Sequence, residues 1–169
     1  MKKTIKLKSK DGFEKIVDKN ILKKSEVLQG LIEDYEFYQS EEDEIPLNEI
    51  GGKNLDLIIQ YLEHYQYMEP KIAPKPFPSR VNWQFLRKIL NDQWTFNYLQ
   101  SLSIEQCIEL INDASYLQIK GLIDILSSKI AYEMCNCTVE EAKKKFNIED
   151  DMTDEEKTKF DKINKYKLI

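Results

Sequence analysis

The chain has 169 residues, 41% of them hydrophobic and 33% charged, which allows one buried core beneath a large polar surface. Its formal net charge is -5 and its pI about 5.1, which excludes bulk binding to nucleic acid or to an anionic membrane, since both need a basic field. No apolar run in the sequence approaches the roughly 18 residues of a membrane helix, so we expect one domain, or one domain with an extension.

The N-terminal residues are patterned as a β-hairpin. Apolar and polar residues alternate along Thr4–Ser9, as in a strand with one buried face. Asp11-Gly12 is a turn signal between strands, and Phe13–Val17 can return as the partner strand. The sequence therefore predicts two antiparallel strands at the start of the domain.

Helices and one short strand are expected over the next forty or so residues. Ser25 is a candidate helix N-cap, whereas Tyr35–Glu44 is acidic and poor in aliphatic residues and is interpreted as a solvated loop. Ile45–Leu47 fits an edge strand, because Pro46 has no N–H to donate to a neighbour. Apolar residues at helical spacing predict an amphipathic helix over Asn54–Tyr65.

A proline-rich stretch follows that helix. Four of the five prolines lie between Pro70 and Pro78, a composition typical of a linker or a long surface loop. We expect a flexible loop over about residues 66–92. Order is expected to resume in the aromatic-rich stretch Trp94–Leu102.

Two neighbouring helices are expected after this loop. Ser103 and Gln106 form a capping-box pattern that opens the first helix. One face of that helix carries Ile104, Ile108, Ile111 and Ser115. The second helix is apolar on a broad face, which predicts a central position, and its apolar residues are Ile119, Leu122, Ile123, Leu126, Ile130 and Met134. Only Leu117–Gly121 separates the two, so they should pack together.

The C-terminal tail is densely charged, with eight lysines against nine acidic residues from Thr138 onward. Capping-box patterns at Thr138-x-x-Glu141 and Thr153-x-x-Glu156 predict two more helices. Each carries an apolar stripe of only about two turns, and short helices are marginal in water unless such a face is buried. The stripes fit either the rim of one helical core or a platform that another protein completes.

Signatures of catalysis are scarce, and no enzyme activity is expected. Gly51-Gly52 lacks the Lys-Ser/Thr of a phosphate-binding loop. His64 could pair with a cysteine as base and nucleophile, but a histidine at a helix end is more often structural. We therefore expect no catalytic residues, no metal site and no cofactor.

The three cysteines, Cys107, Cys135 and Cys137, cannot all pair within one chain. Only Cys135 and Cys137 are close in sequence, whereas structural zinc sites usually draw ligand pairs from two ends of the chain. Free, reduced thiols are the favoured interpretation. They are typical of cytoplasmic or nuclear proteins, and we expect one or both of these locations.

Several motifs occur in an order that is specific to one family. Ala114–Asp124 reads ASYLQIKGLID. Further along the chain come Thr138–Glu141, Phe146–Ile148 and Asp151–Glu156, at spacings that align with the family without a gap. The first is similar to AANYLDIKGLLD, and the second and fourth are similar to TPEE and DFTEEE, of the S-phase-kinase-associated adaptor family. Members of that family join F-box proteins to a cullin in SCF-type ubiquitin ligases. The resemblance extends over roughly Thr4–Tyr166; further matches are Ile5–Leu7, Asp11-Gly12, Ile45–Leu47 and Ile59-Gln60 leading to His64.

The resemblance implies an α/β fold and a function. The fold is a BTB/POZ-type domain over residues 1–134, with a small sheet and a helical cluster, followed by F-box-binding helices over residues 135–169. The function is that of a non-enzymatic adaptor, with F-box proteins and a cullin as partners, no nucleic acid or membrane partner, and weak homodimerisation when free.

The resemblance also implies which residues contact the partners. The positions that bind the F-box are matched by Cys107, Ile108, Ile111, Ile123, Phe146, Ile148, Met152, Asn164 and Tyr166. The positions that bind the cullin are matched by Ser115 and Tyr116.

Some of these positions depart from the family pattern. Ser115 stands where the family has Asn, which bears on the cullin contact, and Tyr166 stands where it has Trp, which bears on the F-box contact. Met152 replaces Phe and Val139 replaces Pro. The alternatives are an elongin-C-like adaptor, a self-associating BTB/POZ module, or an F-box-binding decoy that engages no cullin. Elongin-C-like chains lack C-terminal helices, so residues 138–169 count against the first.

Overall fold

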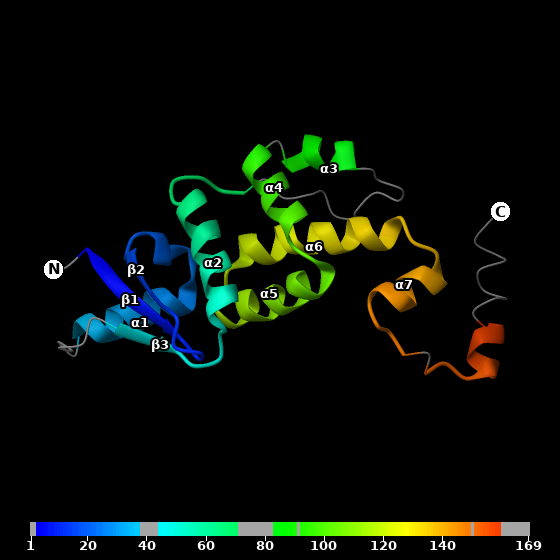
Figure 1. Cartoon of the computed structure of the whole chain (residues 1–169), viewed down its shortest axis with the longest axis horizontal. Helices are drawn as coiled ribbons and strands as arrows, with labels where there is room; N and C mark the ends of the chain where they lie inside the picture. The colour runs from blue at the N-terminus through cyan, green and yellow to red at the C-terminus, as the bar shows by residue number, and fades with distance from the viewer. Residues whose placement is uncertain (1–2, 38–43, 71–82, 91, 150, 160–169) are drawn as a thin grey trace. The chain divides into compact units, whose positions relative to one another are not determined.

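The computed structural model describes residues 3–37, 44–70, 83–90, 92–149 and 151–159. The chain divides into two compact units, Met1–Asn136 and Cys137–Ile169. The first unit combines a small sheet with helices (Figure 1), so the predicted α/β class is confirmed. The domain limit predicted after residue 134 lies close to this division.

In chain order the first unit contains β1 (Thr4–Ser9), β2 (Glu14–Asp18), the 3-10 helix η1 (Ile21–Lys24), α1 (Glu26–Phe37), β3 (Glu44–Leu47), α2 (Gly52–His64), α3 (Trp83–Leu90), α4 (Gln93–Ser101), α5 (Ile104–Tyr116) and α6 (Lys120–Cys135). The second unit contains α7 (Val139–Lys145) and a further helical stretch over residues 154–159.

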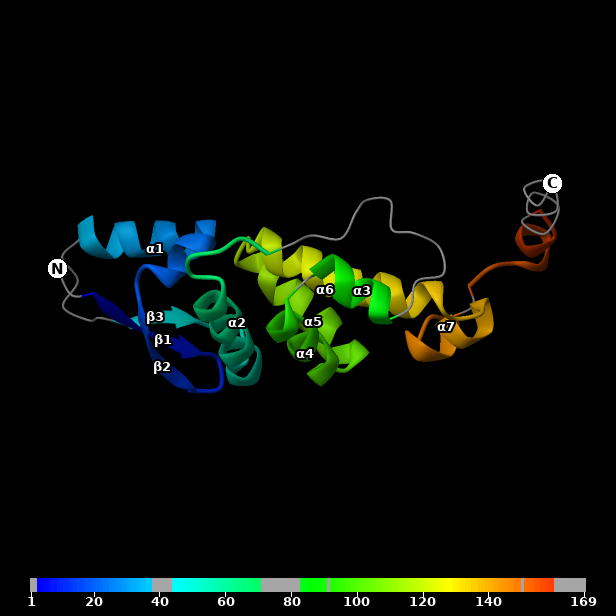
Figure 2. The same cartoon turned by 90° about the horizontal axis from the view of Figure 1, so that it is seen from above.

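The sheet has the strand order β2-β1-β3, with β2 antiparallel and β3 parallel to β1. Figure 2 shows α1 running along one side of these strands. The predicted alternation in β1 is confirmed, because Ile5 and Leu7 are buried while Lys6 and Lys8 are partly exposed. The predicted hairpin is confirmed as well, and so is the edge strand, since β3 ends the sheet on one side.

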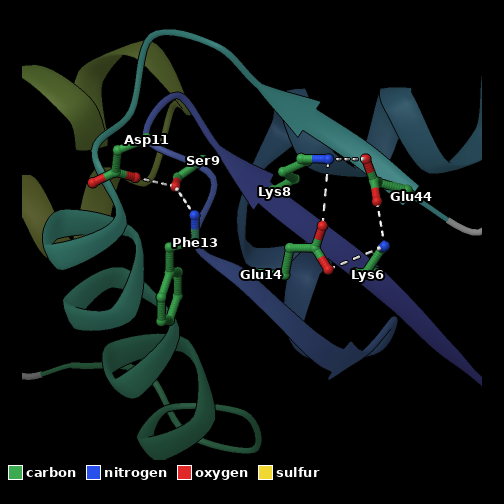
Figure 3. Close-up of polar contacts among 7 residues, drawn as sticks. All are labelled: Lys6, Lys8, Ser9, Asp11, Phe13, Glu14 and Glu44. Carbon is green, nitrogen blue, oxygen red and sulfur yellow. Dashed lines mark hydrogen bonds and ion pairs between the residues drawn. The ribbon is translucent and has the colours of Figure 1, made fainter.

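Four charged side chains alternate in sign on the outer face of the sheet (Figure 3). Glu14 lies 3.2 Å from Lys6 and 3.3 Å from Lys8, and Glu44 contacts the same two lysines, 3.4 Å from Lys8. Hydrogen bonds from the lysines hold the pKa of both glutamates below its ordinary value. Exposed pairs of this kind add little stability because water screens them. They do connect all three strands through side chains.

The hairpin turn is tied to the start of α2. Gly12 has φ of 83°, a conformation that favours glycine. Asp11 accepts a hydrogen bond of 2.9 Å from the Gly52 N–H, one of the amides left without an intrahelical partner at the start of α2. Hydrogen bonds from Ser9 and from the Gly52 amide lower the pKa of Asp11. The turn therefore caps a helix that begins 41 residues later in the chain.

Helix α1 begins as predicted but ends later. The Leu28 N–H donates to Ser25 Oγ at 3.1 Å, which confirms Ser25 as a capping residue. The predicted loop over Tyr35–Glu44 is wrong at both ends, because α1 continues to Phe37 and β3 starts at Glu44. No Gly or Pro stands between Gly30 and Pro46, so acidic composition alone does not stop the helix. Residues 38–43 lie outside the described residues.

The flexible loop predicted over about residues 66–92 is also wrong in part. Residues Trp83–Leu90 form helix α3, and its Leu86 and Leu90 are buried in the core. These leucines lie at i and i+4, the spacing of one helical face, and the prolines all precede them. Residues 71–82, where most of the prolines lie, fall outside the described part of the chain.

The predicted helix pair is confirmed as α5 and α6, which lie side by side (Figure 1). Ser103 and Gln106 form the predicted capping box. The buried face of α5 carries Cys107, Leu110 and Ala114 in addition to Ile104, so the predicted stripe through Ile108 and Ser115 lies to one side of the core contact. In the tight connection, Gln118 adopts φ of 54°.

Helix α6 also buries a lysine. Lys129 is 4% exposed, and its ammonium donates to the carbonyl oxygens of Leu99, at 2.5 Å, and of Leu102. Leu99 lies in the last turn of α4, where the helix dipole is negative, and its carbonyl also accepts a long hydrogen bond of 3.4 Å from the Leu102 N–H. Lys129 therefore joins the end of α4 to α6.

The three cysteines differ in exposure, and this gives a chemical prediction. Cys107 is fully buried, and burial raises its pKa to about 11, whereas Cys135 is exposed and Cys137 half-buried. Because the thiolate is the reactive form, iodoacetamide at neutral pH should modify Cys135 and Cys137 and spare Cys107. Mass spectrometry of the alkylated protein, native and in denaturant, measures this. Equal labelling of Cys107 in the native protein would contradict it.

Candidate protein-interaction site

The outer face of α5 is an exposed surface of the first unit that carries three of the predicted contact residues. It consists of Glu105, Ile108, Glu109, Asn112, Ser115 and Tyr116, all exposed. Ile108 is 42% and Tyr116 50% exposed, on a helix whose other face is buried in the core. Ser115 and Tyr116, predicted to contact a cullin, therefore share one helix face with Ile108, predicted to contact an F-box.

The other predicted residues of the first unit are less accessible. Ile111 and Ile123 are partly buried and pack against the core. Cys107 has no exposed surface, so its side chain supports the outer face of α5 from below and cannot itself contact a partner in this conformation. Met134, which the sequence places on the apolar face of α6, is 47% exposed near the end of that helix.

The second unit presents apolar side chains with little cover. Val139 is 70% and Ile148 51% exposed, and Phe146 and Met152 are half-buried. Among the described residues of this unit, 137–149 and 151–159, none is classed as buried. The unit by itself therefore leaves its apolar residues in contact with water.

Local hydrogen bonds explain how α7 and its flanking residues are held. Thr138 and Glu141 form the predicted capping box. At the other end, Ile148 N–H donates to Lys143 O at 2.9 Å and Asn147 adopts φ of 50°. This is the pattern of a Schellman motif with Asn in the left-handed position, and it turns Ile148 back along the helix. The sequence signal for it is Asn147 directly after the last turn, which the sequence interpretation missed.

The second capping box is also present. Glu156 N–H donates to Thr153 Oγ1, and the Glu156 carboxylate accepts from Thr153 N–H at 2.9 Å. Hydrogen bonds from the Thr153 backbone N–H and hydroxyl to the Glu156 carboxylate lower the pKa of Glu156. Asn164 and Tyr166, the remaining predicted F-box contacts, lie outside the described residues.

His64, the residue considered as a base for a cysteine nucleophile, makes contacts with an aspartate and an aromatic ring. His64 Nε2 lies 3.0 Å from Asp92 Oδ2, and its ring stacks on Trp94 with centroids 4.0 Å apart. Asp92 in turn caps α4 by accepting from the amides of Trp94 and Thr95. Burial raises the pKa of Asp92, but hydrogen bonds from Thr95, His64 and Trp94 outweigh it, so that pKa is lowered. His64 thus belongs to a structural cluster.

Two further kinds of site are absent from the described residues. No three His, Cys, Asp or Glu side chains there come together as metal ligands. In the same residues, no helix has the length and hydropathy needed to cross a membrane.

Comparison with known proteins identifies the family. Residues 3–67 match the Skp1 family tetramerisation domain, and residues 120–166 match the Skp1 family dimerisation domain. The S-phase kinase-associated protein 1 homolog of Tetrahymena thermophila is 31% identical over 150 residues, which covers 89% of this chain and 85% of the relative. The E3 ubiquitin ligase complex SCF subunit sconC of Arthroderma benhamiae is 28% identical over 163 residues, covering 96% and 93%. The resemblance seen in the sequence motifs is confirmed: the chain belongs to the Skp1 family.

Proposed function

We propose that the protein is a non-enzymatic adaptor of an SCF-type E3 ubiquitin ligase, holding an F-box protein and a cullin at the same time. The observation that carries this is the exposure of apolar side chains on the outer face of α5 and in the second unit, where Val139 and Ile148 lack cover. Exposed apolar surface of this kind usually marks a partner site. The relatives named as SCF subunits support the choice of partner.

The adaptor acts by proximity. Binding two proteins to one chain raises the effective concentration of each near the other, with no bond made or broken by the adaptor itself. On this proposal the second unit and Ile108, Ile111 and Ile123 contact the F-box, while Ser115 and Tyr116 contact the cullin. Asn164 and Tyr166 remain part of the proposed F-box contact on the family resemblance alone.

The experiment is co-purification of the full chain with an F-box segment, beside a chain ending at Cys137. The full chain should form a 1:1 complex, and the shortened chain, which lacks the second unit, should not. Ile148→Asp in the full chain should weaken binding by tenfold or more, because it puts a charge where an apolar contact is expected. Ile16→Asp is the matched control, since Ile16 is 70% exposed on the outer face of the sheet and should leave affinity unchanged.

Two outcomes would redirect the proposal. If the full chain binds none of several F-box segments, a self-associating BTB/POZ module becomes the better description. If it binds F-box segments but no cullin, the decoy alternative holds, and Ser115 is the substitution to examine first. In that case Ser115→Asn should restore cullin binding, whereas an intact adaptor should need no such change.

A further inference from the structure

A short turn directly after α2 exposes two large apolar side chains. Tyr67 is 88% and Met68 52% exposed, and Tyr67 is the most exposed large apolar side chain among the described residues. Tyrosine and methionine are both enriched in protein interfaces relative to the rest of a protein surface. We call residues 65–70, which contain this pair, the α2 turn.

Long-range contacts fix the backbone of the α2 turn. The Met68 N–H donates to the Tyr65 carbonyl at 3.2 Å, and the Lys24 ammonium donates to the Met68 carbonyl at 2.9 Å. Lys24 also pairs with Glu69 in the same turn. Tyr67 and Met68 are therefore exposed on a fixed backbone, so a partner that covers them has little backbone order to supply.

The same contacts tie the α2 turn to the connection between α5 and α6. Ser25, directly after Lys24, donates its hydroxyl to the Leu117 carbonyl at 2.5 Å. Figure 2 shows the segment after α2 passing between the start of α1 and the start of α6. Leu117 directly follows Tyr116, which is 50% exposed and proposed to contact a cullin.

Pro70 closes the turn against α6. A Cβ added at Gly121 would lie 2.8 Å from the Cγ of Pro70, so the proline ring packs directly on the backbone of the first turn of α6. Two separate contacts, one through Lys24 and Ser25 and one through Pro70, therefore place the α2 turn at the end of the α5–α6 pair where the two helices are connected.

Ser115 and Tyr116 are too few to form a stable contact by themselves. A stable protein interface buries about 800 Å² on each partner and uses roughly 20–30 residues a side. The cullin contact must therefore extend onto neighbouring elements. Exposed side chains at the start of α1 and in the α5–α6 connection are polar, namely Lys23, Glu26, Gln29, Gln118 and Lys120. The α2 turn, by contrast, offers Tyr67 and Met68.

We propose that Tyr67 and Met68 are cullin contacts, and that the cullin surface of this adaptor runs from Ser115 and Tyr116 across the α5–α6 connection to the α2 turn. The inference rests on the proposed function, and it adds an anchor that the family resemblance did not assign. The part of the cullin that covers the turn should be apolar, because a tyrosine ring and a methionine chain offer it mostly apolar surface. Lys24 is a positioning residue, because it holds the backbone that presents both side chains.

The test measures binding of the full chain to a purified cullin and to a purified F-box segment by calorimetry, with thermal unfolding of every variant. The test variant is Y67S/M68S, and Y67F/M68L keeps the apolar surface. The matched control is I16S, since Ile16 is 70% exposed on the outer face of the sheet, outside the proposed contact.

The expected result is a loss that is specific to the cullin. Y67S/M68S should bind the cullin about tenfold more weakly, as expected for the loss of two apolar anchors at an interface. It should keep the F-box affinity and the Tm of the unaltered chain, because both side chains are exposed and outside the core. Y67F/M68L and I16S should bind the cullin as the unaltered chain does, which separates loss of apolar surface from damage to the fold.

The other outcomes overturn the inference in distinguishable ways. If Y67S/M68S binds the cullin as tightly as the unaltered chain does, the adaptor function stands and the α2 turn is no cullin contact. If the variant keeps cullin binding but loses F-box binding, or loses self-association in analytical ultracentrifugation, the turn serves that other partner and the inference is wrong. If the unaltered chain binds the F-box segment but no cullin, the proposed bridging function fails and the inference fails with it.

Discussion

Replacing Lys129 with methionine is expected to lower the free energy of unfolding by about 2–4 kcal/mol. Methionine keeps most of the apolar stem of Lys129 but removes the ammonium that donates to the carbonyls of Leu99 and Leu102. Both oxygens lose a charged donor in a buried place. The Leu99 carbonyl keeps only the long hydrogen bond from the Leu102 N–H, and the Leu102 carbonyl, left unsatisfied, carries the desolvation penalty of a buried acceptor. The end of α4 also loses the positive charge that its dipole favours.

Urea or thermal unfolding of the two proteins measures this difference, which corresponds to a fall in Tm of roughly 4–16 °C for a unit of this size. Lys88→Met is the matched control, because Lys88 is exposed on α3 and its replacement should change stability by less than about 0.5 kcal/mol. Equal stability of Lys129→Met and the unaltered protein would show that water replaces the ammonium, and that the contact is dispensable.

Replacing Gly52 with alanine should lower the free energy of unfolding by about 1–3 kcal/mol. An added Cβ would clash with the Cβ of Phe13 and would lie 2.9 Å from Oδ1 of Asp11. The obstacle at Phe13 is an atom attached to the backbone, so the hairpin turn itself must shift. That shift would lengthen the hydrogen bond from the Gly52 N–H to Asp11.

Replacing Gly30 with alanine should change the free energy of unfolding in the opposite direction, and it serves as the control. Gly30 lies inside α1, and a Cβ there meets nothing within 4 Å. Alanine should therefore raise stability by about 0.5–1 kcal/mol through helix propensity alone. Urea unfolding curves of the two variants and of the unaltered protein measure both changes in stability. A Gly52→Ala protein as stable as Gly30→Ala would mean that the turn yields without cost, and the close packing described above would not matter.

Local signals explain why much of the fold was predictable. The Asp11-Gly12 turn, the Ser103–Gln106 and Thr138–Glu141 capping boxes and the strand alternation are each written within a few residues, and the structure shows each of them. Such features depend on backbone groups that local side chains satisfy. They are therefore readable before any tertiary contact is known.

Features set by distant contacts were not predictable. Helix α3 forms where proline content suggested a loop, because burial of Leu86 and Leu90 outweighs the composition of the stretch before them. Likewise, no local pattern distinguishes Cys107, fully buried, from Ile108 beside it, which is 42% exposed. Which side of α5 faces the core depends on where α2 and α6 pack. The family resemblance named both Cys107 and Ile108 as contact residues and did not indicate that one is buried and the other exposed.

The candidate interaction site was likewise predictable only in part. Exposure of Ile108, Ser115 and Tyr116 agrees with a surface role, but an exposed residue does not name its partner.

Contacts across the first unit bear on how it folds. The Ser25 hydroxyl, at the start of α1, donates to the Leu117 carbonyl at 2.5 Å, 92 residues later in the chain. Gly121 likewise has no room for a Cβ beside Tyr61 and Pro70. The stretch matched by the tetramerisation-domain model, residues 3–67, therefore shares its core with residues from later in the chain. One buried cluster joins the sheet and α2 to α5 and α6, so we expect the sheet and the α5–α6 pair to lose order in one cooperative transition.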